Sequence, residues 1–418
     1  MLCKKVFYSE WEKNNRALSV ISLRFRSVKT FQSVFRDETK LDINYVPPTL
    51  PHRENEQRLL MEFFSFVLRF PGEMAQRVIV TGDIGTGKTA LSQRFGADIS
   101  REANNRGLNL RYVHVNCREY RGSLFLILQN AVTTFHPNFP KRGYSAEELL
   151  SSLLHILDEE NAYVILTLDE FESLVEREDS EAVYKLTRLQ ETRPNKPQRL
   201  SLICILRNLK AIEQLDASTR STLQLNVIAL QRYSKQQLAD IVTDRLKVAF
   251  KPSAVSEETV DLIAELAFSE NGNARFAIEL LWRAGKYADA EDLPTVMTEC
   301  VRKAVSSIIP TMRKSELASL RLHEKLFLLG VARFFKEEQR AYGTLPEIER
   351  AYAIVCEEFN ERPHSHVQLW KYLQLLSNLD ILKTEVSSAG TRGRSTLVYL
   401  PRISALDLEK ELCAFLGR

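Results

Sequence analysis

Five short apolar runs punctuate the first half of the chain. They are rich in β-branched residues, stretches with helix-like spacing separate them, and they occupy residues 77–80, 110–115, 163–168, 200–206 and 223–230. Apolar runs of this length are typical of strands that are buried on both faces, and their alternation with helices indicates a parallel sheet. Residues 35–230 are therefore predicted to form one α/β domain.

The second half of the chain follows a different pattern. From Ser234 onward strand-like runs disappear and apolar residues recur at helical spacing, which predicts an all-helical domain over residues 231–305. Further helices follow, and two strand-like runs at 382–386 and 396–400 then flank a glycine-containing turn. Helices followed by such a hairpin are typical of a winged helix-turn-helix, which we expect over residues 310–418.

Composition and charge argue against zinc, disulfide and membrane-spanning structures and leave nucleic-acid binding open. The 418 residues suffice for several domains, and 57 Lys+Arg against 54 Asp+Glu neither requires nor excludes nucleic acid. The six cysteines contain no C-x-x-C pair, which argues against a zinc site or a disulfide framework. No apolar run approaches the length of a membrane span, so we expect a cytoplasmic protein with no membrane partner. Residues 1–34 match no pattern and are assigned as an N-terminal extension of unclear order.

The first apolar run leads directly into a phosphate-binding motif. Residues 82–89 read G-D-I-G-T-G-K-T, a full match to G-x-x-x-x-G-K-[ST], and a helix-like stretch follows. In this motif backbone N–H groups surround the phosphates, the lysine reaches the β- and γ-phosphates, and the final hydroxyl coordinates Mg²⁺. The pattern predicts ATP or ADP with Mg²⁺, bound by Gly82, Asp83, Ile84, Gly85, Thr86, Gly87, Lys88, Thr89 and Ala90.

Two acids end the third apolar run. Asp169 and Glu170 follow residues 163–168 directly. Downstream of a phosphate loop, such a pair places one carboxylate in the Mg²⁺ shell, here Asp169 with Thr89, and the other, Glu170, beside the water that attacks the γ-phosphate. Carboxylates at strand ends also occur as loop or cap residues. The phosphate loop upstream favours the catalytic interpretation.

These motifs resemble the AAA+ class, and specifically the archaeal replication initiators related to the origin recognition complex and to the helicase loader of cell division control. Residues 45–54, Y-V-P-P-T-L-P-H-R-E, are similar to the family's N-terminal segment beside the adenine. The resemblance implies Val46 and Pro47 as nucleotide contacts, and Tyr233 is assigned with them. Residues 272–275, G-N-A-R, resemble the family's G-D-A-R motif, which implies that Arg275 is the sensor-2 residue that reaches the γ-phosphate.

Two segments depart from the family pattern. The family usually has Ser-Asn-Asp after the fourth strand, with the asparagine as sensor 1, whereas an ungapped alignment here places Arg207 at that position and Asn208 one residue later. Either Asn208 takes the role after a local shift, or the hydrolytic geometry is altered, so slow turnover is expected. Ser218 stands where the family often has arginine. Arg220 is the remaining candidate for an arginine finger, and a plain helix-surface arginine is the alternative.

Residues 362–379 are the expected DNA-reading stretch, because they contain no acid and would include the second helix of the winged helix. Apolar residues at helical spacing predict its core positions: Leu369, Tyr372, Leu373 and Leu376. The remaining polar positions are the predicted DNA contacts: Ser365, His366, Gln368 and Lys371. Trp370 fits either a core or a contact position.

Two further segments are predicted to touch DNA. Residues 390–394, G-T-R-G-R, resemble the family's wing tip, where Arg392 and Arg394 would enter a narrow groove. The alternative is a solvated hairpin. A proline-bracketed insert precedes a Ser145–Glu148 capping box, and the resemblance implies a second DNA contact there through Lys141 and Arg142.

The resemblance implies an ATP-dependent replication initiator that binds duplex origin DNA and helps recruit or load the replicative helicase. ATP would act as a switch with slow hydrolysis, paralogous initiator subunits would be partners, and the protein would be associated with the nucleoid. The alternatives are a winged-helix signal-transduction ATPase that regulates transcription, a non-hydrolysing ADP-bound DNA-binding paralogue, and a transposition-type AAA+ helper.

Overall fold

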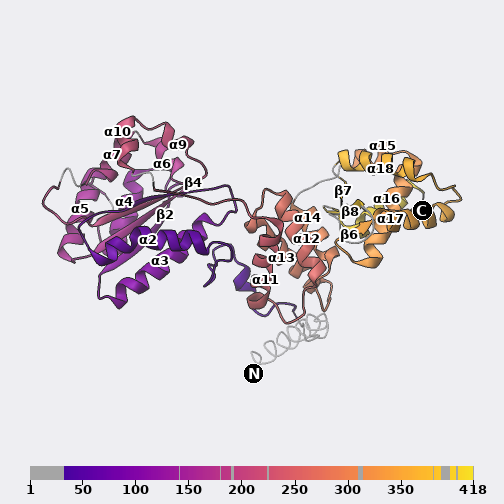
Figure 1. Ribbon diagram of the computed structural model, residues 1–418, viewed down its shortest axis with the longest axis horizontal. Coiled ribbons are helices and arrows are strands. Elements are labelled where there is room, and N and C mark those ends of the chain that lie inside the picture. The colour runs from indigo at the N-terminus through magenta and orange to yellow at the C-terminus, as the bar shows by residue number, and fades with distance from the viewer. Residues whose placement is uncertain are drawn as a thin grey trace, which may run out of the picture.

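A computed structural model of the chain shows three folded units that follow one another along an elongated molecule (Figure 1). A sheet with helices on both faces forms one end, a helical bundle lies in the middle, and helices with a small sheet form the other end. The described residues are 33–140, 142–178, 180–189, 193–223, 226–308, 314–379, 381–386, 396–401 and 403–417. Within these ranges, none of the helices combines the length and the apolar character that a membrane span requires.

Five parallel strands form the sheet of the first unit, in the order β2-β3-β4-β1-β5. All of them fall on the apolar runs of the sequence, and their bounds are β1 (Arg77–Thr81), β2 (Leu110–Asn116), β3 (Tyr163–Asp169), β4 (Leu200–Leu206) and β5 (Asn226–Ala229). β1 lies between β4 and β5, with Val78 opposite Ile203 on one side and Asn226 on the other. The parallel direction brings the carboxyl ends of all strands to one edge, where ligands bind in open α/β sheets.

Helices cover both faces of this sheet, which is why the strand interiors are apolar throughout. One face packs against α2 and α3 through residues such as Leu60 and Phe95, and the other packs against α4, α5 and α6. The helices are α2 (Glu54–Arg69), α3 (Lys88–Asn105), α4 (Leu124–Phe135), α5 (Ala146–Glu159), α6 (Glu172–Arg177), α7 (Ser180–Thr187), α9 (Lys210–Glu213) and α10 (Ala217–Thr222). The capping box expected before α5 is present, because Ser145 and Glu148 each accept the other's backbone N–H.

The middle unit is the all-helical bundle. Its elements are η2 (Glu38–Leu41), α11 (Lys235–Ala249), α12 (Glu257–Ser269), α13 (Ala274–Ala290) and α14 (Thr298–Ile308). Here the structure differs from the expected boundary at residue 35, because Val34, Phe35 and Leu41 lie in the bundle core. The ring centroids of Phe35 and Phe250 are 4.7 Å apart. Residues 34–41 therefore complete the second unit, although the chain next forms the first.

The third unit has the predicted winged-helix form. Its elements are α15 (Lys314–Ser319), α16 (Leu322–Glu338), β6 (Tyr342–Thr344), α17 (Leu345–Glu358), α18 (His366–Asn378), β7 (Lys383–Val386), β8 (Thr396–Tyr399) and α19 (Ala405–Phe415). β7 and β8 are the antiparallel hairpin expected from the sequence. The sequence analysis missed β6, which adds to β8 and is too short for its alternation to be recognised.

A buried arginine joins the bundle to the winged helix. Arg302 of α14 is fully buried. Its guanidinium donates to the carbonyl oxygens of Leu400 at 3.1 Å and Arg340 at 2.6 Å, and to the hydroxyl of Thr298 at 3.1 Å. Burial lowers the pKa of Arg302 to about 10, although Glu299, 3.6 Å away, opposes this shift. Arg302 of the bundle thus binds two backbone carbonyl groups of the winged-helix unit.

One buried and one half-buried carboxylate complete this joint. Glu265 of α12 is 2% exposed and is ion-paired with Lys235 at 2.7 Å and with Lys383 of β7. Glu299 of α14 accepts the N–H groups of Ala405 at 3.1 Å and Leu406 at 3.2 Å, so it caps α19 from the neighbouring unit. Because these charges are paired across the joint, separating the two units would leave them buried or half-solvated without partners.

Arg302→Ala tests this joint. The substitution leaves the carbonyl groups of Leu400 and Arg340 without their donor, and we expect it to lower the free energy of unfolding by about 3–5 kcal/mol, the usual cost of removing one member of a buried charged network. Urea denaturation measures the effect. Arg106→Ala, which removes an exposed ion pair with Glu102 on α3, should cost less than about 1 kcal/mol. Equal losses for the two variants would contradict the role of Arg302.

Candidate functional site

A cavity of about 1320 Å³ lies at the carboxyl edge of the five-stranded sheet, between the sheet and the helical bundle. Residues from both units and from the segment before α2 line it. The predicted nucleotide residues among them are Val46, Pro47, Ile84, Gly85, Gly87, Lys88, Thr89, Ala90, Asp169, Glu170, Tyr233 and Arg275. Segments that lie more than two hundred residues apart in the sequence, from Glu38 to Trp282, thus meet around one space.

The phosphate loop passes from β1 into α3 at this cavity. Gly85 and Gly87 have φ values of 78° and 91°, in the left-handed region that favours glycine. The Lys88 ammonium donates to the carbonyl oxygens of Gly82 at 2.6 Å and Asp83 at 2.8 Å. Burial lowers the pKa of Lys88, while the charge of Asp169 opposes this shift. The loop therefore presents a half-buried cation and the N-terminus of α3 to the same space.

Other residues of the motif make contacts that hold the conformation of the loop. Thr86 is fully buried, and its hydroxyl donates to the carbonyl oxygen of Asp83 at 2.8 Å. The Asp83 carboxylate accepts from Arg232 at 2.5 Å. Gly82, Asp83 and Thr86 are not among the residues that line the cavity.

The acid that ends β3 contacts the end of the motif. The Thr89 hydroxyl donates to Asp169 Oδ2 at 2.7 Å, and His114 Nε2 lies 3.4 Å from the same oxygen. Burial alone would raise the pKa of Asp169, but the hydrogen bonds from His114 and Thr89 outweigh it and lower that pKa. A hydroxyl and an ionised carboxylate in contact are oxygen ligands of the kind Mg²⁺ prefers, so these residues fit the ion. His114, which was not predicted from the sequence, is brought to the same edge of the sheet by β2.

Glu170 has a backbone conformation that is uncommon for a residue with a side chain. Its φ is 50°, in the left-handed region, directly after β3. Its carboxylate lines the cavity, and Oε2 lies 4.0 Å from Arg118 Nη1. Strained backbone of this kind persists where the surrounding structure holds it and is concentrated at functional sites.

Arg207, at the expected sensor position, and Asn208, the residue after it, differ in whether they line the cavity. Arg207 lines the cavity, and its Nε lies 3.6 Å from Glu172 Oε1. Asn208 is exposed, is not among the lining residues, and accepts the backbone N–H of Lys210 at 3.0 Å. The local shift that would bring Asn208 to the site is therefore not present. Arg220 is exposed on α10 and does not line the cavity, so its role as an arginine finger stays a prediction.

The helical bundle contacts the phosphate loop through the G-N-A-R turn. The N–H of Ala274 donates to the Gly85 carbonyl at 3.1 Å. The Asn273 side chain caps α13 and lies against Gly85, so closely that a Cβ on Gly85 would be 1.9 Å from its Oδ1. Arg275, the last residue of the G-N-A-R turn, is exposed and lines the cavity. The bundle thus contacts the loop through a backbone hydrogen bond, and the space at Gly85 is too small for a residue with a side chain.

Two buried arginines that the sequence analysis did not assign to the site also line the cavity. Arg53 is 4% exposed, and Arg245 is 7% exposed. The Arg245 guanidinium donates to the carbonyl oxygen of Lys40 at 2.9 Å and lies 4.8 Å from the centroid of the Tyr45 ring. Arg53 belongs to the quoted P-H-R-E run, so its sequence position was a usable signal, whereas Arg245 resembles any polar helix residue.

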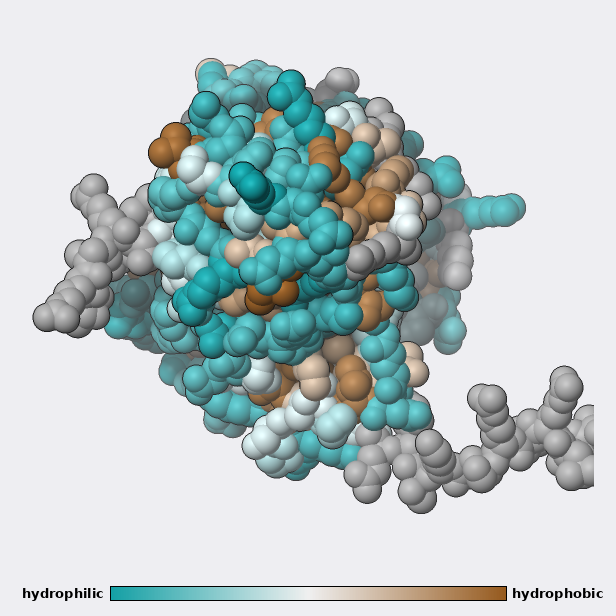
Figure 2. Space-filling model, turned by 90° about the vertical axis from the view of Figure 1, so that its right-hand side faces the viewer, coloured by the Kyte–Doolittle hydropathy of each residue, from teal (hydrophilic) through white to brown (hydrophobic). Residues whose placement is uncertain are grey.

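The predicted reading helix is α18. All four expected core residues, Leu369, Tyr372, Leu373 and Leu376, are buried. Ser365, His366 and Lys371 are exposed and Gln368 is half-buried, and His366 Nδ1 is hydrogen-bonded to the side chain of Glu349 on α17. Trp370 is 37% exposed and Val367 is 68% exposed, so this tryptophan is not a core residue. Figure 2, which views this end of the molecule, shows separate apolar areas within a hydrophilic surface.

Of the remaining predicted DNA contacts, Arg142 lies within the described residues. Arg142 is exposed in the segment between α4 and α5, and so within the insert between β2 and β3. Lys141, Arg392 and Arg394 lie outside the described residues.

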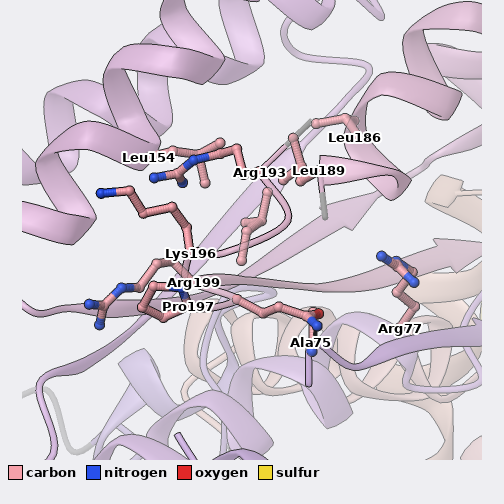
Figure 3. Close-up of a pocket in the computed structure, with 11 residues that line it drawn as sticks. Ala75, Arg77, Leu154, Leu186, Leu189, Arg193, Lys196, Pro197 and Arg199 are labelled. Carbon is pink, nitrogen blue, oxygen red and sulfur yellow. Dashed lines mark hydrogen bonds between the residues drawn. The ribbon is translucent and has the colours of Figure 1, made fainter. Parts of the chain in front are cut away.

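A second, much smaller cavity of about 20 Å³ lies near the opposite, amino edge of the sheet (Figure 3). Leucines and the stems of several cationic residues line it, and the charged ends of Lys196 and Arg199 extend away from that of Arg77. Arg193 and Arg199 both pair with Asp158. A carboxylate of the protein therefore already pairs two of these cations, and a cavity of about 20 Å³ has room for little more than a water molecule.

Comparison with known proteins identifies the parts of the chain. An AAA domain family model matches residues 73–215, the Cdc6 AAA+ ATPase-type lid domain matches residues 239–306, and the CDC6 C-terminal winged helix domain matches residues 315–410. The chain is 34% identical to ORC1-type DNA replication protein 2 of Sulfolobus acidocaldarius over 376 residues, which covers 88% of this chain and 90% of that relative. The chain belongs to the ORC1-type DNA replication protein family.

Solved structures of this ORC1/Cdc6 family share the fold. Cdc6p from Pyrobaculum aerophilum is 29% identical, with a TM-score of 0.78 over 92% of this chain and 99% of that chain. The Aeropyrum pernix ORC1 protein, solved in complex with DNA, is 28% identical, with a TM-score of 0.60 over 92% of this chain and 98% of that chain. The sequence-based identification of an AAA+ ATPase with a lid and a winged helix is thus confirmed.

Gly85→Ala tests the contact between the phosphate loop and the lid. Gly107→Ala is a matched control, because Gly107 also has a positive φ of 69° but has no neighbour within 4 Å of an added Cβ. Both variants should lose about 1–2 kcal/mol of stability from backbone strain. Only Gly85→Ala should displace the lid, which small-angle X-ray scattering would report as a larger radius of gyration. Identical scattering of the two variants would contradict this contact.

Proposed function

We propose that this ORC1-type protein is an ATP-dependent replication initiator that binds ATP and ADP with Mg²⁺ in the large cavity and binds duplex origin DNA through its winged helix. The observation that carries the proposal is the convergence of the phosphate loop, the β3 acids and the lid arginine on one space, namely Lys88, Asp169, Glu170 and Arg275. The three family matches give this convergence its context.

The nucleotide chemistry follows from the groups at the cavity. Thr89 and Asp169 would hold Mg²⁺, which neutralises phosphate charge when bound. Lys88 would bind the β- and γ-phosphates, and Glu170 would accept the proton of the attacking water. Arg275 would reach the γ-phosphate from the lid, so that the lid position depends on which nucleotide is present.

Slow hydrolysis is favoured by the residue at the sensor position. Arg207 places a guanidinium where the family uses an asparagine, and its charge acts on Lys88 in the direction of a lower pKa. A long-lived nucleotide state suits a switch better than a motor. The same observation favours a second candidate, a paralogue that keeps ADP and acts as a DNA-binding scaffold without turnover.

DNA binding is proposed for the exposed face of α18. This face presents Ser365, His366, Gln368 and Lys371, and residues 362–379 contain no acid to repel phosphates. The ORC1 protein of Aeropyrum pernix was solved with DNA, and it shares the winged-helix fold of this chain. Arg142 is proposed as a second contact. Recruitment of the replicative helicase, assembly with paralogous subunits through Arg220, and association with the nucleoid are proposed from family membership.

Glu170→Gln tests the hydrolytic assignment. The amide keeps the size of the side chain but cannot accept a proton, so single-turnover hydrolysis should fall about a hundred- to ten-thousand-fold while ATP affinity is kept. Glu213→Gln, an equivalent change on the exposed α9 outside the cavity, is the control. Unchanged hydrolysis in Glu170→Gln would remove Glu170 from the role, and no hydrolysis by the unmodified chain would favour the ADP-bound scaffold.

Lys371→Ala tests the DNA-binding face. Binding to origin-region duplex should weaken, and the slope of log affinity against log salt should flatten by about one unit for the lost phosphate contact. Lys410→Ala removes the same charge from an exposed position on α19 and should leave the slope unchanged. Equal slopes for all three proteins would exclude α18 as the phosphate-binding helix. A lack of preference for origin-region duplex over random duplex would contradict the initiator function.

A further inference from the structure

A buried guanidinium faces the peptide group between Thr86 and Gly87 in the phosphate loop. It belongs to Arg53, the residue before α2, which is 4% exposed. Its Nε and Nη2 both donate to the Thr86 carbonyl oxygen, each at 3.1 Å. Two donors of one planar, charged group fix the direction of that oxygen more firmly than a single hydrogen bond does.

The direction of this carbonyl determines where the next N–H points. The peptide bond is trans, because the chain has no cis peptide among its described residues, and in a trans peptide the C=O and the following N–H point to opposite sides. With the Thr86 oxygen held against Arg53, the N–H of Gly87 is directed away from Arg53. Gly87 lines the large cavity, and backbone N–H groups at this position of a phosphate loop are anion donors.

We propose that Arg53 is a positioning residue for nucleotide phosphate. It holds the Thr86–Gly87 peptide so that the Gly87 N–H is presented to the phosphate, while its own three nitrogens donate to groups of the protein. This role rests on the nucleotide binding proposed above and adds a residue to it.

The same guanidinium also contacts the beginning of the lid. Arg53 Nη2 donates to the Gln231 carbonyl oxygen at 2.6 Å, and the guanidinium carbon lies 4.0 Å from the centroid of the Tyr233 ring. The Tyr233 hydroxyl in turn lies beside Gly87, where an added Cβ would be 3.0 Å away. Arg53 therefore orients the phosphate donor and the chain that enters the lid together.

If Arg53 had only a structural role, its substitution would change ADP and adenosine binding in a different way. Arg53 also contacts the His52 carbonyl oxygen at 3.2 Å and Glu56 at 3.3 Å, which would anchor α2 regardless of any ligand. Loss of that anchor would weaken adenosine and ADP binding alike. Loss of a positioned phosphate donor would weaken ADP binding and leave adenosine binding unchanged.

The test measures displacement of a fluorescent ADP analogue by ADP and by adenosine, in the full-length chain and its variants. Arg53→Ala should lower the affinity for ADP about tenfold or more, with adenosine affinity unchanged. Arg53→Lys should also lower the ratio of ADP to adenosine affinity, because one ammonium keeps the charge but cannot place two fixed donors on the carbonyl. This second variant keeps the test informative if Arg53→Ala does not fold.

Arg199→Ala is the matched control. Arg199 is 8% exposed, its guanidinium lies 4.6 Å from the centroid of the Tyr163 ring, and it binds Asp158 and Asn161 away from the large cavity. Its removal should lower stability in urea and leave the affinity ratio unchanged. Equal loss of ADP and adenosine affinity in the Arg53 variants, or an unchanged ratio, would overturn the positioning role. Failure of the unmodified chain to bind ADP would instead overturn the proposed function.

Discussion

The arrangement of the whole molecule depends on the contact between the phosphate loop and the turn that begins α13. Ala274 donates to the Gly85 carbonyl, and Asn273 covers Gly85 so closely that only glycine fits. α13 packs on α14, and α14 carries Arg302, which binds the winged helix. Together with the contact of Arg53 to the segment that enters the lid, this backbone contact orients the lid on the phosphate loop and, through α13 and α14, the winged helix. A ligand that moves the loop acts at one end of this series of packed elements.

Buried arginines recur at the joints of this fold, and they share one arrangement. Arg53, Arg245 and Arg302 each donate to backbone carbonyl oxygens of a segment distant in sequence, and each stacks on an aromatic ring. The planar group supplies several donors to backbone carbonyl oxygens, while the ring covers its apolar face. Such a joint is specific because its donors fit one geometry, and its loss is costly because a carbonyl is left unsatisfied in the interior.

Local sequence patterns predict the fold of this chain well, because most of its helices and strands have a recognisable spacing of apolar residues. The apolar runs predict all five strands of the large sheet, and the glycine-lysine motif predicts the loop that follows β1. Contacts over long distances in sequence have no such signal. Phe35 packs on Phe250, and Arg302 is fully buried, yet neither residue differs in sequence from its exposed counterparts elsewhere. The sensor position could not be decided either, since the side-chain directions of Arg207 and Asn208 depend on the turn after β4.

The central place of β1 has a consequence for how the protein is made. Val78 pairs with residues of β4 and β5, so the strand that carries the phosphate loop is synthesised more than a hundred residues before its partners. Strand pairings between residues this distant in sequence form slowly, and an apolar strand that has not yet paired is prone to aggregate. The lid turn that closes on Gly85 is translated later still. On the ribosome, the large cavity is therefore among the last parts of the first three hundred residues to be completed, and the apolar strand before the phosphate loop stays without its partners until β4 and β5 are synthesised.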